Sequence, residues 1–217
     1  NANLLSWSPE GIWFSGFQKT SSHLFLLTPS SKKFSKITQP ADVLANQFSF
    51  SKDFKQMAFV MAAPNQIGEV TISSSIAFAP KTLTQIGEQL KTFKTAPREV
   101  VSWKSRDGAT IEGILIKPAN YDPTKKYPLL VVIHGGPTGI DLPSVAADRY
   151  YPIELFASKG ALILRPNYRG SAGYGKAFRA LNVRNLGVGD YEDVISGVDF
   201  LIGKGMVDKD KVGAMGW

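Results

Sequence analysis

The residues that point most directly to chemistry are Gly135 and Gly136, which lie in the turn His134-Gly135-Gly136-Pro137. Glycine has no Cβ, so a turn of this kind can adopt positive φ angles and bring a backbone N–H close to a ligand. An N–H group fixed in this way can stabilise the negative oxygen that develops when a nucleophile attacks a carbonyl group. An ordinary strand followed by a glycine-proline turn remains the alternative.

Two later segments can contribute to the same site. The first runs from Arg165 to Gly175 with the sequence Arg-Pro-Asn-Tyr-Arg-Gly-Ser-Ala-Gly-Tyr-Gly, and the second is Gly216-Trp217. Each follows a predicted strand, and doubly wound sheets bind ligands beyond the carboxyl ends of their strands. A strand that enters Gly-x, with a serine expected next, is the first half of a nucleophile elbow, Gly-x-Ser-x-Gly. We therefore expect these segments to meet at one edge of a sheet.

Buried strands are expected to position these segments. Leu129–Ile133 and Ala161–Leu164 are short apolar runs typical of parallel strands that are buried on both faces, and Lys211–Met215 reads as a third strand. A helix is predicted between the first two strands, from Ala146 to Lys159, with an N-cap at Pro143-Ser144. Gly160 follows this helix and is expected to end it.

The clearest helical pattern begins at Asp190 and ends at Gly203. Apolar residues recur there at spacings of three and four, which predicts one buried face. Its members are Tyr191, Val194, Ile195, Val198, Leu201 and Ile202, with Glu192, Asp193 and Asp199 mostly on the opposite side. From Leu129 onward, strands and helices alternate, which predicts right-handed crossovers and a mostly parallel sheet covered on both faces.

A hairpin is expected just before this alternating region. Glu99–Lys104 and Thr110–Ile116 alternate apolar and polar residues, and Asp107-Gly108 lies between them. An Asp-Gly pair between two such strands is a strong hairpin signal. We therefore place a domain boundary near residue 95, with one domain over 1–95 and another over 96–217.

The first 95 residues contain short β-prone segments with an internal repeat. Trp7-Ser8-Pro9-Glu10-Gly11 corresponds to Phe50-Ser51-Lys52-Asp53-Phe54, and Ile37-Thr38 corresponds to Leu83-Thr84, at offsets of 43 and 46 residues. Blades of β-propellers repeat about every 40–50 residues. Two blades cannot close a ring, so further blades are expected before Asn1. A small sandwich of unrelated strands is the alternative.

Composition excludes several classes of function. The 217 residues include 43% hydrophobic and 20% charged residues, which fits one large globular domain or parts of two. The formal charge of +7 is spread over single or paired lysines and arginines without a basic stripe, so no nucleic-acid partner is expected. Only two histidines are present, and no carboxylates are spaced to complete a site with them, so no metal site is predicted. No cofactor is expected either.

No targeting signal is visible in these 217 residues. No apolar run is long enough for a membrane span, and no leader is visible, although the chain begins at Asn1 rather than at a methionine. Cysteine is absent as well, which leaves the compartment open. The cytoplasm is favoured, with the periplasm or secretion as the alternatives, and no membrane partner is expected.

Taken together, these motifs resemble the prolyl oligopeptidase family of serine peptidases, and most closely its acylaminoacyl-peptidase and dipeptidyl-peptidase-like branch. The resemblance rests on four segments and covers the whole chain. They are the His134-Gly135-Gly136-Pro137 turn, the loop Asn167–Gly175, the helix start Asp190–Asp193 and the strand Val212–Trp217. The family implies an α/β-hydrolase fold, of which 96–217 would be the N-terminal part, preceded by the last blades of an all-β propeller.

The resemblance also implies an activity and a set of site residues. Members cleave short peptides by acyl transfer to a serine, with histidine as base and aspartate orienting it. Gly136 matches the position whose N–H forms half of the oxyanion hole. His134, Gly135, Pro137, Tyr168, Arg169 and Trp217 would shape the substrate site. Because these hydrolases carry Ser, Asp and His in that order, all three are expected beyond Trp217, and His134 is expected to brace the turn.

Other functions remain open. An esterase of the same fold also uses a His-Gly-Gly turn, and a non-catalytic interaction scaffold is compatible with a stretch that lacks the elbow. Gly170–Lys176 matches the phosphate-loop pattern Gly-x-x-x-x-Gly-Lys, but Ala177 stands where the Mg²⁺-binding hydroxyl belongs, which argues against an NTPase. A homo-oligomer is compatible with the peptidase interpretation. Arg169 is expected to anchor its loop by bidentate hydrogen bonds to a carboxylate or to carbonyl groups.

Overall fold

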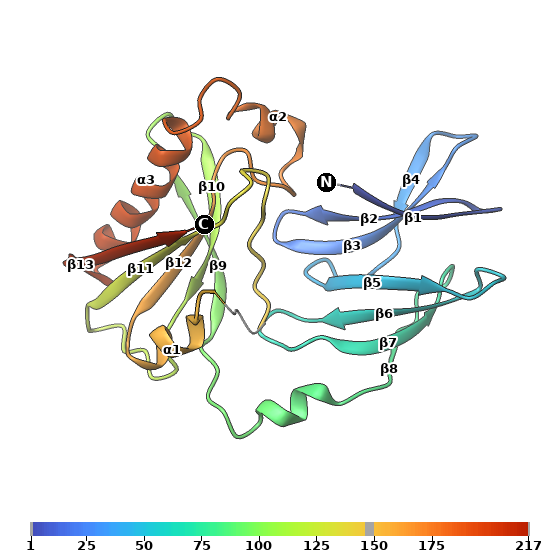
Figure 1. The fold of residues 1–217 in the computed structure, drawn as a ribbon, viewed down its shortest axis with the longest axis horizontal. Coiled ribbons are helices and arrows are strands. Elements are labelled where there is room, and N and C mark those ends of the chain that lie inside the picture. The colour runs from blue at the N-terminus through green and yellow to red at the C-terminus, as the bar shows by residue number, and fades with distance from the viewer. Residues whose placement is uncertain (1, 146–149, 217) are drawn as a thin grey trace. The chain divides into compact units, whose positions relative to one another are not determined.

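The computed structural model describes residues 2–145 and 150–216, and the chain divides into two compact units (Figure 1). The first unit is Asn1–Phe93 and contains only strands and one short 3-10 helix, η1 (Ile86–Leu90). The second is Lys94–Trp217 and contains both strands and α-helices. The change in secondary structure thus falls close to the residue 95 at which the sequence pattern changes.

The first unit consists of two four-stranded antiparallel meanders, joined by one parallel pair between Ser22 and Leu44. Side chains of both meanders share one core, in which Trp13 and Leu24 meet Met57 and Phe59. The strands of the first meander are β1 (Ala2–Ser8), β2 (Gly11–Gln18), β3 (Ser21–Thr28) and β4 (Lys33–Lys36). Those of the second are β5 (Leu44–Phe50), β6 (Gln56–Ala62), β7 (Glu69–Ser74) and β8 (Lys81–Thr82).

The internal repeat is present in the hydrogen bonds of the first turn of each meander. Ser8 Oγ donates to Glu10 over 2.7 Å between β1 and β2, and Ser51 Oγ donates to Asp53 over 2.7 Å between β5 and β6. In both turns a serine that follows an aromatic residue satisfies an acidic side chain two positions later. The 43-residue offset read from the sequence therefore relates equivalent turns.

A second repeated contact joins a threonine near the end of each meander to the backbone of that meander's third strand. Thr38 Oγ1 accepts a hydrogen bond from Leu24 N at 3.2 Å, and Thr84 Oγ1 accepts one from Val70 N at 2.9 Å. Both pairs preserve the 46-residue offset. Such threonines satisfy a backbone donor that the outer strand leaves without a partner. The two meanders are therefore built alike at the level of individual contacts, as neighbouring propeller blades are.

The second unit contains a five-stranded mixed sheet in the order β13-β11-β12-β10-β9. Strand β11 pairs in parallel with β12 and with β13, whereas β10 pairs antiparallel with β12 and with β9. The hairpin β9–β10 and the parallel arrangement from β11 onward both match the sequence prediction. The strands are β9 (Arg98–Lys104), β10 (Thr110–Ile116), β11 (Tyr127–Ile133), β12 (Leu162–Asn167) and β13 (Val207–Gly216).

Helices cover both faces of this sheet, as Figure 1 shows. On one face, Ile153 and Ala157 of α1 (Ile153–Ser158) pack into a core with Ile163 of β12. On the other, α3 (Gly189–Gly203) packs Val194 and Leu201 into a core that includes Leu162 and Leu164. Adjacent residues of β12 therefore point to opposite helices, because side chains alternate along a strand. Along the chain, the short helix α2 (Gly175–Ala180) follows β12 and precedes α3.

The first helix is shorter than the sequence predicts. Residues 146–149 lie outside the described residues, and neither Pro143-Ser144 nor Tyr150-Tyr151 is helical. The helix begins only at Ile153, directly after Pro152. Proline disfavours the helical conformation in the residue before it, so Pro152 keeps Tyr151 out of the helix.

The buried face of α3 also differs from the prediction in two residues. Tyr191, expected on the apolar face, is 57% exposed, whereas Asp193, expected on the solvent side, is fully buried. The prediction assigned residues of this helix to the buried or the exposed face by their hydrophobicity alone. Asp193 is drawn inward because Arg169 pairs with it, and Gly197 allows the helix to approach Trp103 closely. A β-carbon on Gly197 would lie 2.8 Å from that indole ring.

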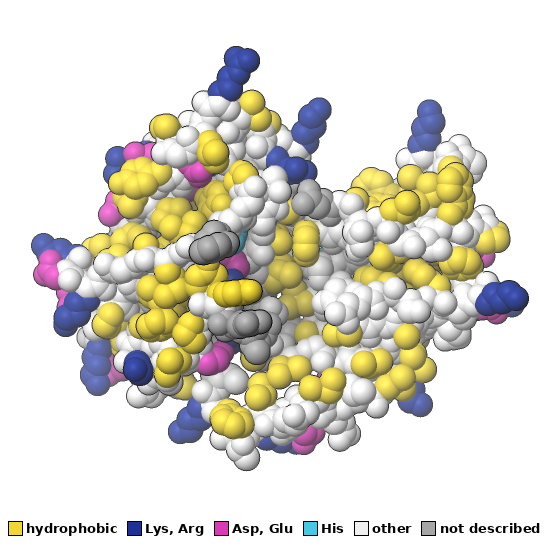
Figure 2. Space-filling model, in the orientation of Figure 1, with side chains coloured by type: hydrophobic (Ala, Val, Ile, Leu, Met, Phe, Trp, Pro, Cys, Tyr) yellow, Lys and Arg dark blue, Asp and Glu magenta, His cyan; other side chains and the backbone are white. Residues whose placement is uncertain are grey.

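The face of the molecule drawn in Figure 2 shows no large basic patch. In Figure 2, lysine and arginine side chains stand singly or in small groups around each unit. Within residues 2–145 and 150–216, no helix has the length and apolar character needed to cross a membrane.

Candidate active site

The turn His134–Pro137 lies beside the end of β13. In the parallel pairing of β11 and β13, Ile133 is opposite Gly216, so both strands end at the same carboxyl edge of the sheet. The chain leaves β11 directly into the turn and reaches Gly216 next to it. This is the edge at which doubly wound sheets bind ligands.

The backbone of the turn admits only glycine at Gly136. Its φ is +133°, and a β-carbon there would lie 2.7 Å from the backbone nitrogens of Thr138 and Gly139. Gly136 is exposed, and its N–H donates to no acceptor in the described part of the chain. The turn therefore presents a free N–H donor whose direction is set by a conformation that other residues rarely adopt.

His134 braces this turn. Its ring stacks on Tyr168 with centroids 4.6 Å apart and planes 21° apart. Nδ1 lies 3.1 Å from Gly135 O, and Nε2 lies 3.0 Å from Ser171 Oγ. The ring thus joins the turn to the loop that follows β12. Ser171 is fully buried and also donates its hydroxyl hydrogen to Tyr168 O at 2.6 Å.

Tyr168 fixes the start of the turn through the backbone of His134. Its hydroxyl donates to His134 O at 2.6 Å, and the residue is only 5% exposed. Burial, followed by the negative charges of Asp190 and Asp141, raises the pKa of Tyr168 to about 12. The phenol therefore remains protonated, and so remains a donor, throughout the physiological pH range.

Arg169 points away from the turn into a buried ionic network. Its Nε and Nη2 donate to the two carboxylate oxygens of Asp193 over 2.9 and 2.7 Å. Nη1 and Nη2 donate to Asp107 over 2.8 and 3.1 Å. The guanidinium lowers the pKa of the Asp107 carboxyl, chiefly by hydrogen bonding. Arg169 does form the expected bidentate bonds, so its side chain positions the loop and does not face the turn.

Three further residues were predicted to shape the substrate site: Gly135, Pro137 and Trp217. Gly135 is exposed, and Pro137 is half-buried beside a second hollow, which also contains Thr138. Trp217 lies outside the described residues. In the part of the chain that the structure describes, no three acidic or histidine side chains gather as they would around a metal ion.

Sequence reasoning missed several supporting residues. Ser171 and Asn167 were part of the quoted loop but had no assigned role. Asn167 is fully buried and forms two reciprocal hydrogen bonds with the backbone of Asp141, at 2.7 and 2.9 Å. An asparagine at the end of a buried strand was a usable signal, because a buried amide must find partners. Nothing in the sequence around Asp141 indicated its role.

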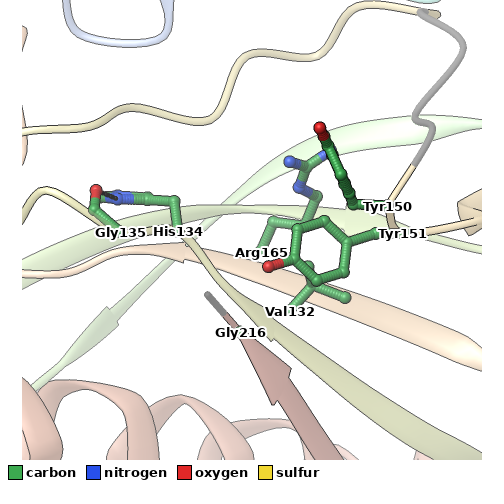
Figure 3. Close-up of a pocket in the computed structure, with 7 residues that line it drawn as sticks. All are labelled: Val132, His134, Gly135, Tyr150, Tyr151, Arg165 and Gly216. Carbon is green, nitrogen blue, oxygen red and sulfur yellow. Dashed lines mark hydrogen bonds between the residues drawn. The ribbon is translucent and has the colours of Figure 1, made fainter.

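A cavity of about 700 Å³ opens at this edge of the sheet, on the face that α1 covers. Figure 3 shows Arg165 extended beside Tyr150 and Tyr151, with His134 and Gly135 set apart from them. The Arg165 guanidinium also pairs with Asp141 at 2.6 Å. Cavities that hold small ligands are roughly 300–1,000 Å³, so this one has room for a short peptide segment.

Fold and site together define the class of protein: the first part of an α/β-hydrolase sheet with a glycine-containing turn at its carboxyl edge, preceded by propeller-like meanders. Residues 148–217 match the sequence pattern of the Prolyl oligopeptidase family. An uncharacterized peptidase, YuxL, of Bacillus subtilis is 28% identical over 79% of this chain and 26% of its own length. Dipeptidyl-peptidase 5 of Porphyromonas gingivalis is 25% identical over the full chain and 31% of its own length.

The fold is also similar to that of a solved peptidase structure. The acylaminoacyl peptidase of Pyrococcus horikoshii superimposes with a TM-score of 0.77 and 25% identity, over 94% of this chain and 31% of that protein. The resemblance to the prolyl oligopeptidase family is thereby confirmed, and the chain is a relative of these peptidases. It spans about a third or less of the length of the proteins it matches.

Proposed function

We propose that the whole protein is a serine peptidase of the prolyl oligopeptidase type that hydrolyses short peptides, in the manner of acylaminoacyl- or dipeptidyl-peptidases. Residues 1–95 would be propeller blades, and 96–217 the first part of the catalytic domain. The observation that carries the proposal is the exposed Gly136 N–H beside the end of β13. A nucleophile directly after that strand would face the donor.

The proposed reaction is acyl transfer by a Ser-His-Asp triad located beyond Trp217, so residues 1–217 alone would be inactive. The serine attacks the peptide carbonyl, whose oxygen becomes negatively charged in the tetrahedral intermediate. Gly136 N–H donates to that oxygen, and the residue after the serine supplies the second donor. Loss of one such donor lowers kcat by roughly 10²–10³, or about 3–4 kcal/mol.

His134 is assigned no proton transfer in this mechanism. Its ring is held against Tyr168 and Ser171, and it directly precedes the two glycines of the turn. In this position it supports the oxyanion donor, and a histidine beyond Trp217 acts as the base. The contacts of His134 and Tyr168 keep the turn rigid before substrate arrives, which is the condition for useful electrostatic stabilisation.

The test uses the full-length protein and two measurements. A fluorophosphonate probe reports whether a reactive serine is present, and chromogenic peptide amides report turnover. Replacement of Gly136 by glycolic acid through in vitro translation turns its N–H into an ester oxygen without adding a side chain. We expect the altered protein to melt normally and to lose at least about a hundredfold in turnover.

Three outcomes would contradict the proposal. Near-normal turnover without the Gly136 N–H would remove the role assigned to that donor. Turnover of esters but never of peptide amides would favour an esterase of the same fold. An intact protein that never reacts with the probe would favour a non-catalytic scaffold.

A further inference from the structure

A second hollow, of about 390 Å³, lies next to the turn that contains Gly136. One side consists of Pro137 and Thr138, the residues that follow Gly136. The other side comes from α2 and the loop after it, and includes Lys176, Arg179 and Asn182. The hollow therefore adjoins the turn that would hold the reacting carbonyl.

Asn182 is the unusual residue of this hollow. It is only 8% exposed, yet neither its Oδ1 nor its Nδ2 has a hydrogen-bond partner in the described part of the chain. Most buried side-chain amides in folded proteins are paired, because an unpaired one loses its hydration without compensation. An amide left in this state on the wall of a hollow indicates a ligand that supplies the missing partner.

Two positive charges accompany this amide. Lys176 and Arg179 are exposed, and within residues 2–145 and 150–216 neither forms an ion pair with a carboxylate. A guanidinium binds a carboxylate through two parallel hydrogen bonds, an ammonium adds a point charge, and the NH₂ of an asparagine adds a neutral donor. All three donors suit a carboxylate, which would pair with Asn182 Nδ2, whereas Asn182 Oδ1 requires a donor such as a substrate N–H.

We propose that this hollow binds a carboxylate of the peptide substrate, close to the bond that is cleaved. The inference rests on the proposed peptidase function. A substrate whose carbonyl oxygen meets Gly136 N–H passes Pro137 and Thr138, which border the hollow. The carboxylate is either the C-terminal group of a short peptide or the side chain of an Asp or Glu residue.

Paired substrates test the proposal in the full-length protein, with kcat/KM as the measurement. One pair differs only in a free or amidated C-terminus, and another only in Glu or Gln near the cleaved bond. We expect the charged member of one pair to react about 10- to 100-fold faster, as a charge-assisted hydrogen bond allows. The pair that shows the effect identifies which carboxylate is bound.

Variants connect the preference to the hollow. Arg179→Gln combined with Lys176→Gln should reduce the preference towards equality by lowering kcat/KM for the charged substrate. Asn182→Asp places a negative charge in the hollow and should disfavour the charged substrate. Lys159→Gln combined with Lys94→Gln, the control, removes the same two positive charges from exposed positions outside the hollow and should leave the preference unchanged.

The outcomes separate this inference from the proposed function. A protein that cleaves both members of each pair equally is a peptidase without a carboxylate site here, and this inference is then wrong. A preference that persists in the double variant would likewise overturn it. A protein that cleaves no peptide refutes the proposed function, and this inference with it.

Discussion

Arg169→Met should destabilise the protein far more than loss of its exposed partner. Methionine fills similar space but carries no charge, so Asp193, which is fully buried, would keep only the Arg169 backbone N–H, at 2.8 Å. Breaking a buried ion pair from one side costs about 3–5 kcal/mol. Asp107 is 53% exposed, and Asp107→Asn should cost within about 1 kcal/mol.

A double variant tests whether the buried charge is the cause. Arg169→Met with Asp193→Leu removes both charges, so it should recover about 0.5–3 kcal/mol of the loss caused by Arg169→Met alone. Urea unfolding of the full-length protein gives the midpoints. Hydrogen exchange at amides of β12 and α3 shows whether the loss falls on these elements, since two units need not unfold in one transition.

The critical result is the order of the variants by unfolding midpoint. If Arg169→Met and Asp107→Asn shift the midpoint equally, Asp193 is not left as an uncompensated charge and the reasoning fails. A double variant less stable than Arg169→Met alone would also refute it, because packing and not charge would then explain the loss.

Four further predictions concern the site and its surroundings. Gly136→Ala keeps the N–H but places a β-carbon 2.7 Å from two backbone nitrogens, so the turn must distort; both the melting temperature and peptide turnover should fall, and normal turnover would contradict this. Tyr168→Phe removes the hydroxyl that holds the turn carbonyl and should cost about 1 kcal/mol in thermal unfolding, so an unchanged melt would be evidence against it. Arg169 lowers the pKa of Asp107, so the stability that this pair contributes should be complete above the ordinary pKa of aspartate, about 3.9. That stability should be lost as the pH falls through the lowered pKa. Asp107→Asn should therefore weaken the dependence of the urea unfolding midpoint on pH in this acid range. Calorimetry should detect no Mg·ATP binding, and a micromolar affinity that Lys176→Ala abolishes would restore the phosphate-loop interpretation.

Local signals predicted much of the fold. Five apolar residues running into His134-Gly135-Gly136 were enough to locate β11 and its turn, and Asp107-Gly108 was enough for the hairpin β9–β10. The repeat in the first unit was visible because serines and threonines recur at fixed offsets from aromatic or apolar residues. In each case the determining residues are neighbours in the sequence.

Features that depend on distant residues could not be predicted. The burial of Asp193 needs Arg169, which lies 24 residues away. Asp141 is held by Asn167, 26 residues later, and carried no local signal of its own. The unpaired amide of Asn182 is visible only after α2 and the turn have been placed in space. Such residues are polar, and hydrophobic periodicity assigns polar residues to the surface.

The Arg169 network also has a consequence for the order of folding. Its guanidinium joins partners 62 residues earlier, at Asp107, and 24 residues later, at Asp193. Closing chain segments of that length costs entropy before the contact is gained, so such contacts form late. The hairpin β9–β10 can form from local contacts, but the loop that carries Tyr168 is locked only after α3 has docked. We therefore expect the turn at Gly136 to reach its final geometry in the last stage of folding, after synthesis has passed Asp193.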